Sequence, residues 1–113
     1  MLEKLNRVNY LFDFYGQLLT KKQQSIMEMY YKENFSLAEV AGHFNVSRQA
    51  VHDTLSRAVR TLEKWEKKLK LYENYLLRRE AGLKALDLLS KERLDSEEIS
   101  ELRKIIKLFM NES

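Results

Sequence analysis

The stretch SLAEVAGHFNVSRQAVHDTLSRAVR, residues 36–60, decides the fold. Ser36 followed by Glu39 forms a capping box, the pattern in which two side chains satisfy the first amide groups of a helix. Asn45 suits the left-handed backbone of a tight turn, and Ser47 is a good N-cap for a second helix. A short capped helix, a turn and a basic helix are typical of a helix-turn-helix, whose second helix can enter a groove of nucleic acid.

Apolar residues recur in this unit at helical spacing and predict its interior. The inward positions expected here are Val40, Ala41, Phe44, Val46, Val51 and Leu55. From the second helix onward, apolar residues step by about 4 and 3, so one helical face runs well beyond residue 60. This stripe comprises Val51, Leu55, Ala58, Leu62, Trp65 and Leu69. The pattern can continue through Tyr72, Leu76, Leu83 and Leu86. Gly82 is its weak point, so the sequence allows one long helix or two helices that break near Gly82.

Helices are also predicted on both sides of this unit. Before it, apolar spacing indicates a helix that ends at Gly16, and a capping box at Thr20 begins another that ends near Asn34. After it, Asp95 can cap a last helix, with Glu98 three residues on. The apolar stripe expected of that last helix is Ile99, Leu102, Ile106 and Phe109. We expect residues 69–89 to cover it, either of the same chain or of a second subunit.

Composition supports an all-α fold of about five or six helices. Proline is absent and glycine occurs three times, so little interrupts the helices, and 44% hydrophobic residues suffice for a core. We expect a helical domain at residues 1–70, which contains the helix-turn-helix, and a helical extension at residues 71–113 that is no separate domain and could serve dimerisation. The lack of a long apolar segment or of a signal peptide predicts a cytoplasmic protein without a membrane partner.

The positive charge of the chain is concentrated in one segment. The 113 residues carry 20 Lys and Arg against 17 Asp and Glu, a net charge of +3. Residues 47–70 hold seven of the basic and three of the acidic residues, so their net charge of +4 exceeds that of the whole chain. The predicted second helix of the helix-turn-helix is therefore the basic part of the molecule, which favours a polyanion partner.

Beyond these patterns, the sequence resembles two known families. Residues 36–41 and 44–51 look like the fourth region of bacterial sigma factors. The resemblance to the YlxM family is closer and covers roughly residues 5–72; it rests on residues 9–15, 18–23, the Tyr30-Tyr31 pair, the helix-turn-helix and residues 66–69. It implies a sigma-region-4-like all-α fold, a nucleic-acid-binding role and an association with the signal recognition particle, the GTPase and RNA complex that targets proteins to membranes.

The sigma-like docking also implies roles for particular residues. The side chains expected to face the major groove are Ser47, Arg48, Gln49 and His52. Among these, Arg48 suits guanine and Gln49 suits adenine edges. Arg57, Arg60 and Lys64 lie further along the helix and would contact phosphates, which position the protein without reading sequence.

Asp53 departs from the sigma pattern, in which a basic residue is common at this point. An aspartate that faces the groove repels phosphates unless it accepts from a cytosine amino group. The YlxM pattern tends to an acid there, which gives weight to a structured RNA or a protein partner. Three hypotheses follow: a nucleic-acid-binding component of the signal recognition particle pathway, an adaptor that binds the targeting GTPase, or a DNA-binding transcription regulator.

Other chemistry finds no support in the sequence. Cysteine is absent, and neither His43 nor His52 has a second ligand at metal-binding spacing, so we expect no metal and no cofactor. No glycine-rich phosphate loop or nucleophile with a positioned base is present, so we expect no enzyme. The aromatic residues of the first two helices could stack on bases, but their spacing favours the core. The pairs Glu63-Lys67 and Glu66-Lys70 are expected on solvated helix faces.

Overall fold

The computed structural model describes residues 2–110, and in this part of the chain every regular element is helical. The α-helices are α1 (Leu2–Tyr15), α2 (Lys21–Met27), α3 (Leu37–Phe44), α4 (Arg48–Leu69), α5 (Leu71–Leu89) and α6 (Ser96–Met110). A 3₁₀ turn, η1 (Gly16–Leu18), precedes α2, and a π-helical segment, η2 (Glu28–Lys32), follows it directly. The predicted all-α fold is confirmed, and none of the described helices is long and apolar enough to cross a membrane.

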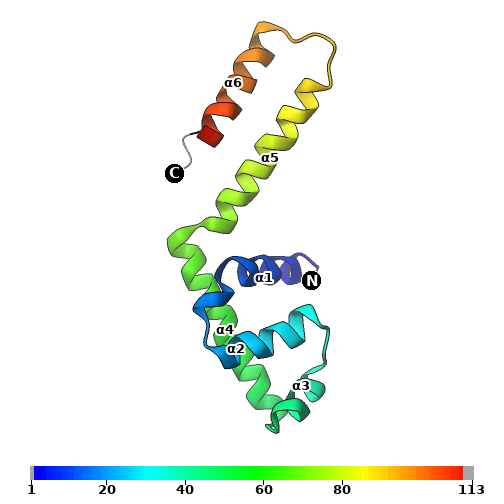
Figure 1. The fold of residues 1–113 in the computed structure, drawn as a ribbon, viewed down its shortest axis with the longest axis vertical. Coiled ribbons are helices and arrows are strands. Elements are labelled where there is room, and N and C mark those ends of the chain that lie inside the picture. Colours follow the sequence, from blue (N-terminus) through cyan, green and yellow to red (C-terminus); the bar gives the residue numbers. More distant parts are fainter. Residues whose placement is uncertain (1, 111–113) are drawn as a thin grey trace. The chain divides into compact units, whose positions relative to one another are not determined.

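The chain divides into two compact units between Tyr72 and Glu73. In the first, the N-terminal unit, α1, α2 and α3 each pack against α4 (Figure 1). The second, the C-terminal hairpin, consists of the rest of α5 and of α6. The largest side chains enclosed in the N-terminal unit are Tyr15, Leu11, Ile26, Met27, Leu62, Val40 and Val51, each less than 2% exposed.

The predicted helix boundaries in the N-terminal unit are set by local hydrogen bonds. The capping boxes at Thr20 and Ser36 are both formed, each with its reciprocal bond from the side chain three residues on. Asn34 and Asn45 adopt the left-handed conformation, with φ of 60° and 55°. The Ser47 hydroxyl accepts from the Ala50 amide at the start of α4. An N-cap of this kind contributes about 1 kcal/mol, so these residues fix where the helices begin.

The sequence allowed one long helix or a break near Gly82, and the structure shows neither. Gly82 lies inside α5, and the chain instead breaks at Lys70, which has a left-handed φ of 55°. The cause is a buried polar contact. The amide of Tyr72 donates to the Glu66 carboxylate at 3.0 Å, and the amide of Leu71 donates to the Tyr15 hydroxyl at 3.0 Å. These two acceptors cap α5 where it begins, so the next helix can start immediately after Lys70.

In the C-terminal hairpin, α6 runs antiparallel to α5 (Figure 1). The predicted capping box at Asp95 and Glu98 is formed, and Lys84 of α5 lies 2.5 Å from Glu101 of α6. The predicted apolar stripe of the last helix is only partly right. Ile105 is its buried residue, whereas Ile106 is 56% exposed. Ile99 and Phe109 are also more than 40% exposed, because one facing helix covers only one side of α6.

Candidate nucleic-acid interface

The helix-turn-helix consists of α3, the turn at Asn45 and Val46, and α4. The amide of Val46 donates to the Ala41 carbonyl at 3.0 Å, and that of Asn45 to the Gly42 carbonyl at 3.3 Å. These bonds satisfy the last carbonyls of α3, as is usual where a residue after a helix is left-handed. Val40, Ala41, Val51 and Leu55 are buried, as predicted, and Phe44 and Val46 are half-buried. The turn therefore fixes α4 against α3 and leaves the opposite face of α4 exposed.

The four residues predicted to read bases all lie exposed at the start of α4. Ser47 has a second task, because its hydroxyl caps the helix through Ala50. The Gln49 side-chain amide donates to the Asp53 carboxylate at 2.9 Å, and the His52 Nδ1 lies 3.8 Å from the same Asp53 oxygen. Asp53 thus orients Gln49, whose amide oxygen stays available as an acceptor.

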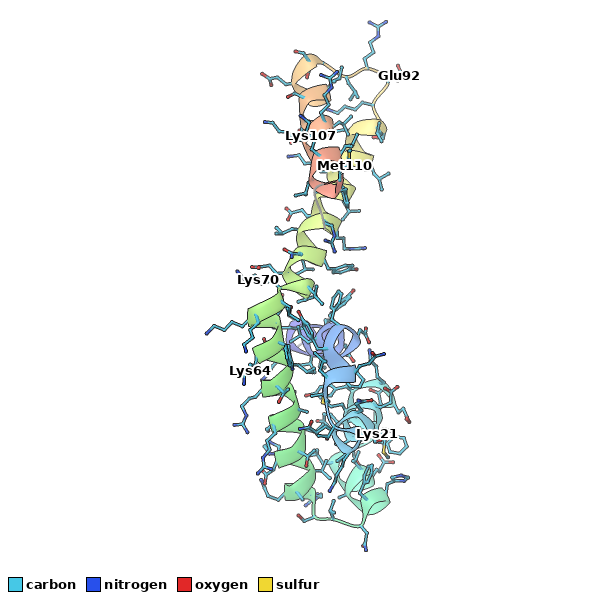
Figure 2. The ribbon with its side chains drawn as sticks, turned by 60° about the vertical axis from the view of Figure 1, so that its left-hand side comes forward. Lys21, Lys64, Lys70, Glu92, Lys107 and Met110 are labelled. Carbon is cyan, nitrogen blue, oxygen red and sulfur yellow. The ribbon has the colours of Figure 1, made fainter. Side chains whose placement is uncertain are left out.

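The three residues predicted to contact phosphates lie on one exposed face of α4. Arg57, Arg60 and Lys64 are exposed, and their spacing of three and four residues places them along one side of the helix. Figure 2 shows Lys64 on the side of α4 that faces away from α2. Lys67 and Lys68 lie on the same exposed surface, although neither was predicted to contact phosphates. We call the whole set the basic stripe: Arg57, Arg60, Lys64, Lys67 and Lys68.

The glutamates of α4 are held away from the basic stripe, contrary to the sequence prediction. Glu63 pairs with Arg7 of α1 through two hydrogen bonds of 2.7 and 2.9 Å, and not with Lys67. This bidentate contact raises the pKa of Arg7. Glu66 is buried, with 6% exposure, so it forms no solvated pair with Lys70. The two glutamates therefore reduce the positive potential of the exposed face only slightly.

Tyr15 is the main partner of the buried Glu66 carboxylate. Its hydroxyl donates to Glu66 Oε1 at 2.6 Å while accepting from the Leu71 amide. Burial and this hydrogen bond raise the pKa of Tyr15 to about 12. A carboxylate can be buried when its hydrogen bonds are satisfied. Here the Tyr15 hydroxyl of α1 and the Tyr72 amide beyond the helix break both donate to Glu66. The contact ties α1 to the end of α4 and so holds the exposed face in place.

The aromatic residues divide between the core and half-exposed positions. Tyr15 is buried, as the core interpretation expected, and the Tyr10 ring stacks on Tyr72 with centroids 5.2 Å apart. Tyr30 and Tyr31 are both half-buried. Trp65 is half-buried too, with the Lys68 ammonium 5.9 Å from its ring centre. Among the described residues, no group of three His, Asp or Glu side chains is placed to hold a metal ion.

The sequence profile described as "UPF0122: Putative helix-turn-helix protein, YlxM / p13 like" matches residues 2–106. The chain belongs to the UPF0122 family. The match extends over the helix-turn-helix and most of the C-terminal hairpin, whereas the sequence motifs had pointed to residues 5–72 alone. The family description agrees with the helix-turn-helix formed by α3 and α4.

Relatives of this UPF0122 chain occur in several bacteria. A UPF0122 protein of Lactococcus lactis subsp. cremoris (strain MG1363) is 52% identical over 77 residues, which are 68% of this chain and 69% of the relative. A UPF0122 protein of Bacillus mycoides (strain KBAB4) is 47% identical over 102 residues, 90% of this chain and 93% of the relative. A Bacillus cereus (strain AH187) relative is 46% identical over the same length. The second and third alignments include the hairpin as well as the N-terminal unit.

Proposed function

We propose that this UPF0122 protein binds nucleic acid through the exposed face of α4. The observation that carries the proposal is the separation of charge on the part of α4 that follows the exposed Asp53. The five cations of the basic stripe are exposed, and among the described residues none of them forms an ion pair. The two glutamates of the same helix are paired with Arg7 or buried beside Tyr15. A face of this kind attracts the phosphate backbone, and the helix-turn-helix family supports the same assignment.

Sequence readout would fall to the first turns of α4. Arg48 and His52 are exposed there, and Gln49 is held by Asp53. In this arrangement Gln49 and Asp53 both present acceptor oxygens, which suits a cytosine or adenine amino group better than a guanine edge. A base contact at this position would therefore involve the pair and not Gln49 alone.

We further propose a role in protein targeting, which rests on the family resemblance. We propose that the nucleic acid is the RNA of the signal recognition particle, with its GTPase as a second partner, and that the protein acts in the cytoplasm by binding and not by catalysis. Asp53, in the first turns of α4, fits this proposal. It would repel the phosphates of duplex DNA, whereas in a structured RNA it could face unpaired bases. Two alternatives differ in their partner: an adaptor that binds the GTPase alone, and a regulator that binds duplex DNA.

We further propose that two copies associate through the C-terminal hairpin. Leu83, Leu86, Leu89 and Ile106 are each between 56% and 67% exposed, an unusual amount of apolar surface for one pair of helices. A second copy would cover this surface with an equally apolar one and turn two helices into four. Sedimentation equilibrium tests this, because Leu86→Glu should give a monomer at concentrations where the unmodified chain is a dimer. A monomeric unmodified chain would contradict the proposal.

Fluorescence anisotropy at one fixed, moderate salt concentration tests the nucleic-acid proposal. The probes are signal recognition particle RNA, an unrelated structured RNA and duplex DNA, because affinities compare only at equal salt. We expect preference for the first. Preference for duplex DNA would support the regulator, and no binding to any of the three would support the adaptor.

A pair of matched triple variants locates the binding face. The first replaces Arg57, Arg60 and Lys64 by Ala, and the control replaces Arg103, Lys104 and Lys107 of α6 by Ala, so both lose three exposed cations. The first variant should weaken binding on every probe and lower the salt dependence, log K against log salt, by about two to three units, since each phosphate contact contributes about 0.7 to 0.9. Equal losses in both variants would mean that binding follows net charge and not α4.

A further inference from the structure

A cavity of about 360 Å³ lies in the N-terminal unit beside the basic stripe. Four elements line it: α1, the π-helical segment η2, the first turn of α3 and α4. Its inner wall is apolar, because Val8 and Leu55 are buried there. Its size falls within the range of about 300–1,000 Å³ that is usual for sites of small organic groups.

Two tyrosines give this cavity an aromatic wall. Tyr30 and Tyr31 both line it, with ring centres 5.0 Å apart and planes at 85° to each other. Consecutive residues of an α-helix point about 100° apart, and the wider turn of η2 brings both rings to one cavity. Both rings are half-buried, and burial raises the pKa of Tyr31. Such a wall can receive a flat aromatic group.

The charge of the lining separates this cavity from two others of the molecule. Lys4 and Arg60 line it, and among the described residues its lining holds no aspartate or glutamate. A cavity of about 420 Å³ on the other side of η2 is lined by Glu28 and Glu33. A groove of about 380 Å³ in the C-terminal hairpin contains the Glu101 carboxylate. An aromatic group that carries negative charge therefore fits the first cavity better than these two. A groove of about 320 Å³ in the hairpin, with Arg78 and Arg79 in its lining, also has no acid among its described residues, but it contains no residue of the basic stripe.

We propose that this cavity takes one unpaired nucleotide of the nucleic acid bound along α4, with the base against the tyrosines and its phosphate near Arg60. The inference rests on the proposed function. Its link to that function is Arg60, which belongs to both the basic stripe and the cavity lining, so a strand that follows the stripe passes the cavity mouth. His52, predicted to face bases, is part of the same lining. Aromatic stacking of unpaired bases is the usual way in which proteins hold single-stranded segments.

The test compares a fully paired duplex with the same duplex carrying one bulged 2-aminopurine nucleotide, each made in RNA and in DNA. The unmodified protein should bind the bulged form roughly tenfold more tightly, since stacking of one base is worth about 1–3 kcal/mol. Stacking should also change the 2-aminopurine fluorescence. Preference for the bulged form together with this signal supports the inference.

Variants that fill the cavity or remove one of its aromatic rings test whether the preference for the bulged duplex depends on the cavity. Ser56→Trp places a large ring in the lining and should reduce the preference to less than about twofold while the paired duplex still binds. Thr61→Trp, on the same helix and outside this lining, is the matched control and should keep the preference. If Ser56→Trp fails to fold, Tyr31→Leu takes its place, with Tyr31→Phe as a control that keeps the ring.

The outcomes separate the two proposals. Equal affinity for both duplexes would overturn the cavity inference and leave the proposed function intact. No binding to any duplex or RNA probe would overturn the proposed function and the inference with it. If adenosine monophosphate binds to the unmodified chain in calorimetry while the bulged duplex is not preferred, the cavity serves a free nucleotide, and the inference about the bound strand is wrong.

Discussion

The N-terminal unit and the C-terminal hairpin are both built from helices that contain many apolar residues, but they enclose very different interiors. In the N-terminal unit, α1, α2 and α3 surround α4, and Leu11 and Leu62 have no exposed surface. In the described part of the hairpin, Leu88 and Ile105 are the buried apolar residues, and Leu86 is 67% exposed. The difference teaches that apolar periodicity predicts a helix, whereas the number of packed neighbours decides whether its apolar face is covered.

The largest expected effect comes from truncating one leucine in each unit. Leu62→Ala should lower the free energy of unfolding by about 2–5 kcal/mol, because it leaves a cavity in a closed core. Leu86→Ala should cost less than about 0.5 kcal/mol at dilutions where the chain is monomeric, because it removes exposed surface. Urea unfolding followed by far-ultraviolet circular dichroism measures both. Similar losses in the two variants would show that the hairpin leucine is covered in solution.

Tyr15→Phe should have the next largest effect, since it removes the hydroxyl that bonds to both sides of the helix break after α4. Loss of the hydroxyl removes the donor to the buried Glu66 carboxylate and the acceptor of the Leu71 amide. An unsatisfied buried group costs about 1–3 kcal/mol, so we expect destabilisation of that order in urea unfolding. Tyr30→Phe is the control, because its half-buried hydroxyl has no such contact among the described residues. A Tyr15→Phe variant as stable as Tyr30→Phe would refute the role given to the contact.

The same tyrosine predicts how stability responds to alkaline pH. Its pKa is raised from 10.0 to about 12 in the folded chain, first by burial and then by the hydrogen bond to Glu66. A group whose folded pKa is raised contributes its stability below the unfolded pKa and loses it as pH rises through the folded one. The unmodified chain should therefore lose stability between about pH 10 and 12, and Tyr15→Phe should lose less over that interval. Parallel pH profiles for the two chains would count against this assignment.

The sequence predicted features that depend on neighbouring residues and missed those that depend on distant ones. The caps at Thr20 and Ser36 and the left-handed turn at Asn45 follow from a few adjacent residues, and all three were predicted correctly. The break at Lys70 was missed because it depends on Tyr15, which lies 51 residues from the carboxylate that it holds. A local interpretation could only treat such a glutamate as a surface residue.

The candidate site shows the same division. The exposed position of Arg57, Arg60 and Lys64 could be predicted, because helical periodicity alone assigns residues to the side opposite an apolar stripe. The ion pair that holds Glu63 away from the stripe could not be predicted, since its partner Arg7 is 56 residues away. The cavity beside the stripe could not be predicted either, because η2 brings two consecutive tyrosines to one wall and apolar periodicity does not predict a π-helical segment.

The smallest expected effect uses a glycine in each unit. Gly82 of α5 and Gly42 of α3 have ordinary helical backbones, and an added Cβ would meet nothing within 4 Å at Gly42 and only the Phe109 ring, at 3.8 Å, at Gly82. Alanine should therefore stabilise each helix by about 0.5–1 kcal/mol, chiefly through the lower entropy of the unfolded chain.

Hydrogen exchange followed by mass spectrometry measures the stabilisation by alanine in each unit separately. Gly82→Ala should slow exchange across the hairpin, whose stability depends on few tertiary contacts, by roughly two- to fivefold. Gly42→Ala should instead raise the global unfolding midpoint, because α3 is part of an enclosed core that opens as a whole. If Gly82→Ala also raised the global midpoint, the hairpin and the N-terminal unit would unfold together, and the contrast between a closed core and an open one would not extend to their stability.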